Sequence, residues 1–400
     1  MKNKIGVGTL ILAILLVGMA LVPPVSAQKE NDYSVTTEDA FKHANANMID
    51  FIAADAPNFE NWAGASIDPK PVELYDINGQ KLFYQFSVYK AKKLIGTIDV
   101  CADKTLGHSI NDIAFDPKPY KAAEAIKKSK EIAKKNYLTG EIKSTKMVVY
   151  SYPSIGAMTV VKDKTTGEEY KIFVDAYSLE EVQDKPATET ELGVWSMYDQ
   201  ILKNGKDNNL KEWQKSDELS NSIEQAAVNK GVNINLVVTE ENMNKLSTDA
   251  VITASASKKL GVPLRGQERD IYCGEASIQM ISLYYGKPTP SQKSIYDYFF
   301  DPEDEPAGPN PSEMIYWAKN KWGKTGLLTS SCTSSGAITE INSYRPFYSM
   351  IPGHYRVCQG YLIQNGYTYL YINDPMPVGS SGTPKIERID NSETKRIYVR

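Results

Sequence analysis

The stretch GVPLRGQERDIYCGEASIQMISLYYG, residues 261–286, places a cysteine at the point where a polar loop turns into a helix. Apolar residues between Ala276 and Ile281 are spaced to face one side of a helix, and Gly286 stands where that helix would end. Cys273 is then at the helix N-terminus, where unpaired backbone N–H groups and the helix dipole favour a thiolate. The sequence predicts a nucleophilic cysteine at this position.

A second stretch, PGHYRVCQGYLIQNGYTYLYINDP at residues 352–375, supplies a base and a group to orient it. A lone cysteine is more often a buried small apolar residue, and a lone histidine in a strand is more often structural. Here His354 opens one predicted strand and Asp374 closes the next, so an antiparallel hairpin brings them together. His354 would accept the thiol proton, and the Asp374 carboxylate would hold the imidazole in place.

The register of this hairpin matters for the predicted site. A clean two-residue turn at Asn365-Gly366 would pair Asp374 with Val357 and aim Asp374 away from the face of His354. The catalytic interpretation therefore predicts an irregularity, either a bulge or odd-length loop near Asn365-Gly366 or a backbone departure just before Pro375.

Residues 262–375 resemble the bacteriocin-processing, double-glycine leader peptidase family within the papain-like group. The matching features are Gln267, Cys273-Gly274 with the small residues after it, the helix end at Tyr284-Tyr285-Gly286, Gly353-His354 and Asp374-Pro375. The resemblance implies a papain-like α+β fold, in which a helix carrying the cysteine packs on an antiparallel sheet carrying the histidine and aspartate.

The same resemblance assigns the site residues. It implies Cys273 as nucleophile, His354 as general base, Asp374 as orienter and Gln267 as the oxyanion donor. Two departures affect specificity. Tyr272 stands where many relatives carry an acidic residue, and residues 355–359 read YRVCQ instead of a run of valines. Double-glycine specificity is therefore not expected to carry over.

The N-terminal half runs twice through one order of elements, a helix and then a group of strands. The first helix begins near Thr37, and three strands follow it, with a hairpin signal at Asn78-Gly79. The second helix begins after Pro119, and three more strands follow that one. The order resembles duplicated cystatin or PepSY modules of the kind found in pro-segments of secreted peptidases.

The sequence therefore predicts four parts: a signal peptide at residues 1–27, a pro-segment of two helix-plus-sheet modules at 28–182, a helical connector at 183–260 and the papain-like peptidase domain at 261–400. Lys2 and Lys4 precede an apolar run that ends in Val25-Ser26-Ala27, which is typical of a secretory signal. We expect a secreted or cell-surface protein, anchored in the membrane only if that segment is retained.

The amino-acid composition restricts the classes of partner and cofactor that we expect. A net charge of −4 without a basic stripe argues against nucleic acid, and neither the four cysteines nor the three histidines have metal-site spacing, so no cofactor or metal is expected. The partners expected are a peptide or protein substrate and the chain's own pro-segment. For Cys332 and Cys358, bridged and free states both remain open. The acidic loop at residues 301–306 is more typical of a solvated turn than of a calcium site.

Two other functions remain open from the sequence. One is a different thiol acyl-transfer enzyme on the same scaffold, such as a cell-wall amidase or a transglutaminase-like protein. The other is a non-catalytic extracellular binding protein that has kept the fold. The intact set of Gln267, Cys273, His354 and Asp374 favours the peptidase, because a scaffold freed from catalysis has no need for all four.

Overall fold

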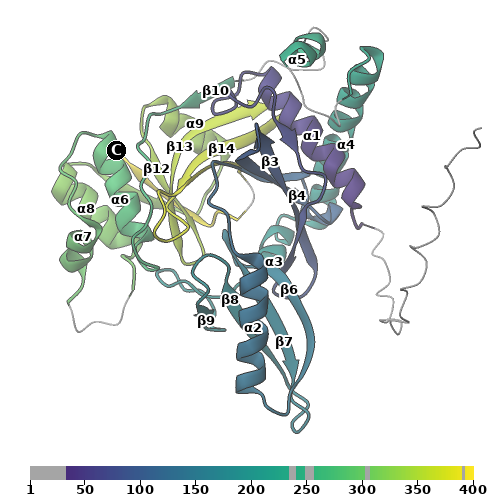
Figure 1. Ribbon diagram of the computed structural model, residues 1–400. Coiled ribbons are helices and arrows are strands. Elements are labelled where there is room, and N and C mark those ends of the chain that lie inside the picture. Colours follow the sequence, from purple (N-terminus) through teal and green to yellow (C-terminus); the bar gives the residue numbers. More distant parts are fainter. Residues whose placement is uncertain (1–32, 234–239, 248–255, 302–306, 390–391) are drawn as a thin grey trace, which may run out of the picture. The chain divides into compact units, whose positions relative to one another are not determined.

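The strands form one hydrogen-bonded series that continues from the C-terminal half of the chain into the N-terminal half (Figure 1). The computed structural model describes residues 33–233, 240–247, 256–301, 307–389 and 392–400. Within these residues the strand order is β11-β16-β12-β13-β14-β15-β5-β4-β3-β2-β6-β7-β8-β9, with β1 on β3 and β10 on β13. Neighbouring strands are antiparallel except β2 and β6, which are parallel.

The first part of the chain has the predicted helix followed by an antiparallel meander. Its elements are α1 (Thr37–Ala53), β1 (Ser66–Ile67), β2 (Val72–Asp76), β3 (Lys81–Lys90), β4 (Lys93–Cys101), the 3-10 turn η1 (Lys104–Leu106) and β5 (Ile110–Phe115). The hairpin predicted at Asn78-Gly79 is confirmed, with Gly79 at a φ of 88° between β2 and β3. Strand β5 was not predicted, and it proves to be the strand that joins the two halves.

The second part repeats this order. Helix α2 (Ala122–Asn136) is followed by β6 (Glu141–Ser151), β7 (Ser154–Lys162), β8 (Glu169–Asp175) and the short β9 (Glu181–Val182). Helix α2 packs across β6, β7 and β8 through small residues such as Ala125 and Ala133. The helix and the three strands predicted here are confirmed.

The connector is largely helical where the structure describes it. It contains α3 (Met197–Leu202), α4 (Lys206–Asn229), α5 (Glu240–Ser247) and β10 (Ala256–Lys259). Helix α4 packs against α1 (Figure 1), and buried Trp213 lies on its inner face. The polar stretch at residues 201–213, with its Asn204-Gly205 break, predicts an exposed turn, but Asn209 there is buried and donates to the Thr105 carbonyl at 2.7 Å.

The C-terminal part sets helices against an antiparallel sheet. The helices are α6 (Cys273–Tyr284), α7 (Gln292–Phe299), α8 (Pro311–Trp322) and α9 (Ser334–Asn342). The strands are β11 (Gly326–Thr329), β12 (Phe347–Ile351), β13 (His354–Gln364), β14 (Tyr367–Asp374), β15 (Thr383–Arg388) and β16 (Lys395–Val399). Helix α6 packs on β13, which places the first residue of the helix beside the first residues of the strand.

The two halves are joined through the sheet and through buried side chains. Strand β15 pairs with β5, with Ile386 opposite Ile113. Gln364 and Asn365, at the tip of the β13–β14 hairpin, both donate to the Asp50 carboxylate of α1, at 3.1 and 2.7 Å. Tyr369 packs its ring edge-on against Phe51. Residues 35–400 accordingly form one compact unit.

Several expectations fall on residues that the structure does not describe. These are the signal segment at 1–27, most of the strand candidate at 233–238, much of the connector stretch at 247–259 and most of the acidic loop at 301–306. Within the described residues, no helix has both the length and the apolar character that crossing a membrane requires.

Candidate active site

Cys273 is the first residue of α6 and lies against the start of β13. Apolar residues of α6, including Ile278 and Ile281, are buried against the sheet and fix the helix there. The Cys273 Sγ accepts a hydrogen bond from the Tyr355 N–H at 3.5 Å, so the sulfur is next to the residue that follows His354. The side chain is almost closed to solvent, with 4% of its residue surface exposed.

His354 and Asp374 form a buried pair at the ends of neighbouring strands. The His354 Nε2 lies 2.9 Å from the Asp374 Oδ1, which also accepts the Met376 N–H at 2.9 Å. An ionised carboxylate only accepts, so the neutral imidazole carries its hydrogen on Nε2 and keeps a lone pair on Nδ1. The Nδ1 has no hydrogen-bond partner among the described residues and is the atom free to act as a base.

The predicted irregularity of the hairpin is confirmed, but its place differs. The turn at Asn365-Gly366 is a clean two-residue turn in which both residues have positive φ, and Gln364 pairs with Tyr367. The shift lies instead between Cys358 and Gly360, so Gln359 is bulged and Val357 pairs with Asn373. That one-residue shift returns Asp374 to the face of His354.

Two hydrogen bonds hold Gln359 in the bulge, one from outside the hairpin and one from within it. Its carbonyl accepts the Leu260 N–H at 2.7 Å, just past the end of β10. Its side-chain amide donates to the Asn373 Oδ1 at 2.5 Å. The strand that precedes the catalytic domain in sequence thus helps to set the register on which the His354–Asp374 pair depends.

The charges around Asp374 keep it ionised despite its burial. Burial would raise its pKa, but the charge and hydrogen bond of His354 lower the pKa to about 2, with help from Lys385 and Arg356. Breaking such a buried pair by removing one partner is costly, because the other charge is left without compensation.

For Cys273, in contrast to Asp374, the surroundings favour the uncharged form. Burial raises its pKa to about 12, against the lowering effect of the Tyr355 and Gly274 N–H groups, and the Glu275 charge raises it further. The sequence predicted a thiolate at this helix N-terminus. In this structure the loss of solvent outweighs the helix end, and the thiol form is favoured.

Gln267 is buried beside the site, but its amide is already engaged. The Nε2 donates to the carbonyl oxygens of Arg269 and Asp270, both at 3.0 Å, and the Oε1 has no partner among the described residues. An amide nitrogen has two hydrogens, so both are in use. The structure therefore places Gln267 as a brace of the loop before Cys273, with no free N–H for an oxyanion.

A segment of the connector lies against both sides of the site, and no local sequence pattern indicated this contact. The Gly308 N–H donates to the Thr190 carbonyl at 3.1 Å. On the other side, the Glu191 carbonyl lies so close to Gly353 that a Cβ there would stand 2.5 Å from it, and Gly353 has a φ of 70°. Only glycine fits this combination of close approach and positive φ.

We call residues 188–193 the covering segment. Glu189 forms an ion pair with Lys395, and Glu191 forms one with Lys185 at 2.9 Å. The Thr188 N–H donates to the Glu191 carbonyl at 3.1 Å, which closes the segment into a compact loop.

Glu275 is a buried acid two residues after Cys273 that was not among the residues predicted from the sequence. Neither of its carboxyl oxygens has a hydrogen-bond partner among the described residues. Burial, with a smaller effect of the Glu313 charge, raises its pKa to about 8. Its presence in the first turn of α6 was visible in the sequence, but its burial was not.

The remaining candidates are structural. Trp317 and Trp322 of α8 are buried in the core. All four cysteines are free thiols, so Cys332 and Cys358 are not bridged. Among the residues that the structure describes, no cluster of histidine, cysteine or acidic side chains could hold a metal ion.

Comparison with known proteins bears on the C-terminal part of the chain. Residues 259–399 match the model of the Peptidase_C39 like family. This match supports a C39-type cysteine peptidase. It covers the elements from α6 to β16 and the loop before α6, including Gln267, Cys273, His354 and Asp374. No curated protein matches the chain.

Two solved structures are similar at low identity. A C39-like peptidase candidate from Bacillus anthracis is 14% identical, covers 36% of this chain and 98% of its own, and has a TM-score of 0.29. UfSP from C. elegans is 13% identical and also has a TM-score of 0.29. The match covers 36% of this chain and 34% of UfSP.

Proposed function

We propose that this chain is a secreted cysteine peptidase made as a precursor, with Cys273 as nucleophile, His354 as general base and Asp374 as orienter. One observation carries the proposal. The Cys273 sulfur accepts the N–H of the residue after His354, while the His354 Nε2 is held by Asp374 and the Nδ1 is left free.

The reaction uses these atoms in order. The His354 Nδ1 takes the proton of the Cys273 thiol as the sulfur attacks the peptide carbonyl carbon. The C–N bond breaks, the amine leaves with that proton, and a thioester forms on Cys273. His354 then takes a proton from water, whose oxygen attacks the thioester and releases the acid, and the thiol is restored.

The developing oxyanion needs donors. In this proposal the Cys273 backbone N–H, unpaired at the start of α6, is one of them. Gln267 would be the second, which requires one of its hydrogen bonds to the Arg269 or Asp270 carbonyl to be released when substrate binds.

The precursor state is supported by the covering segment. It contacts Gly308 on one side of the site and Gly353 on the other, and the buried thiol is held in its less reactive protonated form. Displacing the segment would readmit water, lower the pKa of Cys273 and open the groove. Inhibition of the precursor would thus come from a few residues of the connector that follows the pro-segment.

The proposal also includes secretion of the chain and a common origin for its two helix-and-meander parts. Residues 1–27 would direct secretion and then be removed, which the N-terminus of the extracellular protein would reveal by mass spectrometry. The two helix-and-meander parts would derive from one duplicated module of the cystatin or PepSY type, since both set a helix before an antiparallel meander.

The activity is tested with Cys273→Ala in the full chain, assayed on a peptide library and on cell-wall peptides. We expect the chain with residues 188–193 replaced by a glycine–serine stretch to hydrolyse peptides, and the same chain carrying Cys273→Ala to be inactive. Cys332→Ala, which removes a half-exposed thiol from a loop outside the site, is the matched control and should retain activity. Activity that persists in Cys273→Ala, or cleavage confined to cell-wall substrates, would refute the proposal.

A further inference from the structure

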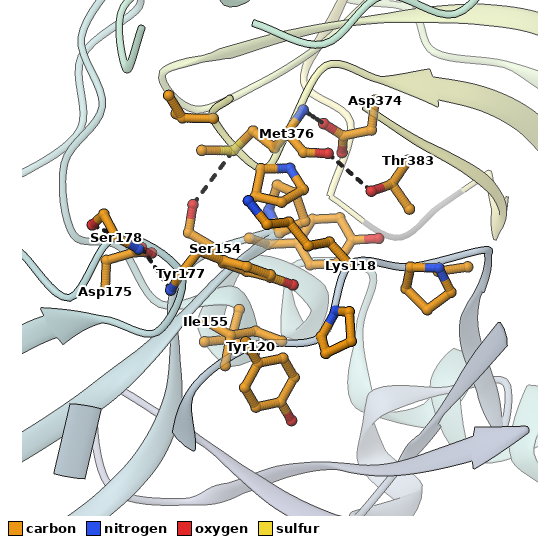
Figure 2. A pocket seen from close by; sticks show the side chains of 18 of the residues that line it. Lys118, Tyr120, Ser154, Ile155, Asp175, Tyr177, Ser178, Asp374, Met376 and Thr383 are labelled. Atoms are coloured by element: carbon orange, nitrogen blue, oxygen red, sulfur yellow. Dashed lines mark hydrogen bonds between the residues drawn. The ribbon is translucent and has the colours of Figure 1, made fainter. Parts of the chain in front are cut away.

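A cavity of about 960 Å³ lies beside the site and is lined in part by Asp374. In Figure 2, Asp374, Met376 and Thr383 lie at one side of the cavity, and Ser154 contacts Met376 at 3.5 Å between its Oγ and the sulfur. Lys118, Tyr120 and Tyr177 also line the cavity. Leu192 and Gly193 of the covering segment also line it. The cavity is therefore built from both halves of the chain and meets the site at Asp374.

Two carboxylates face each other in the wall of this cavity. Asp99 of β4 and Asp112 of β5 are register partners in the sheet, an arrangement in which like charges repel. Asp112 accepts hydrogen bonds from Tyr152 and Asn111, at 3.0 and 2.9 Å. The Asp99 Oδ1 has no partner among the described residues, although only 6% of the Asp99 surface is exposed.

The cations nearby do not balance this pair. Arg356 is bound to Glu387 at 2.8 Å, which uses its charge. Lys385 acts on Asp99, but it also acts on Glu387 and Asp374, and its ammonium lies over the Tyr152 ring at 4.9 Å. Burial and the charge of Asp112 raise the pKa of Asp99 well above its usual value. The Gln85 side chain and the Lys385 charge lower this pKa only in part, and among the described residues no cation is bound to the pair itself.

The rest of the lining suits a positively charged, elongated group. Acidic residues outnumber basic ones among the lining residues, and five tyrosines, among them Tyr120, Tyr152 and Tyr177, present aromatic surface. Aromatic faces attract ammonium and guanidinium groups. The rim residues Lys118 and Glu180 are exposed, so the cavity is reached from solvent as well as from the site.

We propose that this cavity is a substrate subsite that takes a lysine or arginine side chain, with its cationic group beside Asp99 and Asp112. The inference rests on the proposed peptidase function, because it is the peptide running past Asp374 that would deliver the side chain. The cationic group supplies a positive charge bound to the carboxylate pair, and its aliphatic stem packs along the tyrosines.

Binding is tested in full-length Cys273→Ala with three small probes: N-acetyl-lysine amide, N-acetyl-glutamine amide and N-acetyl-norleucine amide. These probes fit the cavity without needing the covered groove. We expect the lysine probe to bind at least about tenfold more tightly than the other two, by calorimetry or NMR titration. Asp99→Asn, which keeps the shape and removes the charge, should abolish that preference, as should Asp112→Asn.

Asp116→Asn is the matched control, because Asp116 is an exposed acid just after β5 that does not line the cavity. It should leave binding unchanged. Equal binding of the three probes, or a preference that survives both Asp99→Asn and Asp112→Asn, would overturn the proposal. Peptide hydrolysis by the chain with residues 188–193 replaced is measured separately. If the protein binds the lysine probe through Asp99 but that chain hydrolyses no peptide, the cavity proposal stands and the peptidase proposal fails.

Discussion

At the scale of single residues, Asp374 has two tasks that a substitution can separate. It accepts the His354 Nε2–H, which fixes the tautomer, and it supplies a buried negative charge. Asp374→Asn keeps an acceptor and loses the charge, whereas Asp374→Ala loses both. We expect Asp374→Ala to lower kcat/KM by about 10²- to 10⁴-fold and Asp374→Asn to lower it clearly less. Equal losses in steady-state assays would mean that the charge alone matters.

Glu275 predicts an unusual dependence of stability on pH. Its folded-state pKa of about 8 lies above its usual value of 4.5, so the folded protein keeps a proton that the unfolded chain releases. The free energy of unfolding should therefore fall between pH 4.5 and 8, by at most about 1.4 kcal/mol per pH unit from this residue, and change no further above that.

Glu275→Gln should remove this fall and make the protein more stable at pH 8 than the wild type, measured by urea unfolding at several pH values. Glu268→Gln, which changes an exposed acid in the loop before α6, is the control and should leave the profile unaltered. A wild-type profile that is flat from pH 5 to pH 8 would contradict the assignment.

The sequence predicted which residues form the candidate site, but not how each of them is bonded and buried. Cys273, His354 and Asp374 were found because helix starts, strand ends and Pro-Gly punctuation are local signals. The engagement of Gln267 with the Arg269 and Asp270 carbonyls depends on the path of a loop, which no local pattern records. The burial of Cys273, which reverses the expected charge state of the thiol, depends on packing across the whole site.

At the scale of elements, the sequence analysis missed two features that depend on pairing between distant strands, the bulge at Gln359 and strand β5. The bulge at Gln359 is held by the Leu260 N–H at the end of β10, a contact between residues about a hundred positions apart. Strand β5 carries Asn111 and Asp112 at its centre, residue types depleted in strands, so its pattern did not indicate a strand. Pairing with β4 and β15 overrides that propensity.

The covering segment gives an element-scale prediction. Replacing residues 188–193 with a glycine–serine stretch of equal length removes the Glu189–Lys395 and Lys185–Glu191 ion pairs and loosens the contact at Gly353. The rate of Cys273 alkylation by iodoacetamide and the rate of peptide hydrolysis by the full chain should both rise at least about tenfold. This corresponds to a change of about 1.4 kcal/mol in the free energy with which the segment covers the site.

The same replacement in the exposed β7–β8 turn, residues 163–167, is the matched control and should change neither rate. The alkylated residue is identified by peptide mapping, because Cys332 is more exposed than Cys273 in the covered state. Unchanged labelling of Cys273 after the replacement would show that the segment does not close the site.

At the scale of the whole molecule, the N-terminal half is built into the sheet of the C-terminal half. Sequence indicated a separable pro-segment, because each half has its own pattern of elements. The junction consists of the β5–β15 ladder, the contacts of Gln364 and Asn365 with Asp50, and the packing of Tyr369 on Phe51. Such a junction depends on the register between distant strands, which neither half reveals alone.

This junction predicts that cutting the connector does not release the N-terminal half. A specific protease sequence inserted at the exposed turn between α3 and α4, residues 203–205, allows one cut. The two pieces should co-elute on gel filtration and separate only in denaturant, because the cut leaves the ladder and the shared core intact. Residues 261–400 expressed alone should be poorly soluble, since the paired edge of β15 and the apolar side chains beneath α1 become exposed.

The outcome decides how the precursor would become active. If the pieces stay together and the nicked protein remains as inactive as the uncut chain, activation must come from displacement of the covering segment, with the N-terminal half retained as part of the working enzyme. The control is the uncut chain carrying the same insertion, which isolates the effect of cleavage. A stable, soluble and active fragment of residues 261–400 would instead show that the N-terminal half is a dispensable inhibitor, despite the continuous sheet.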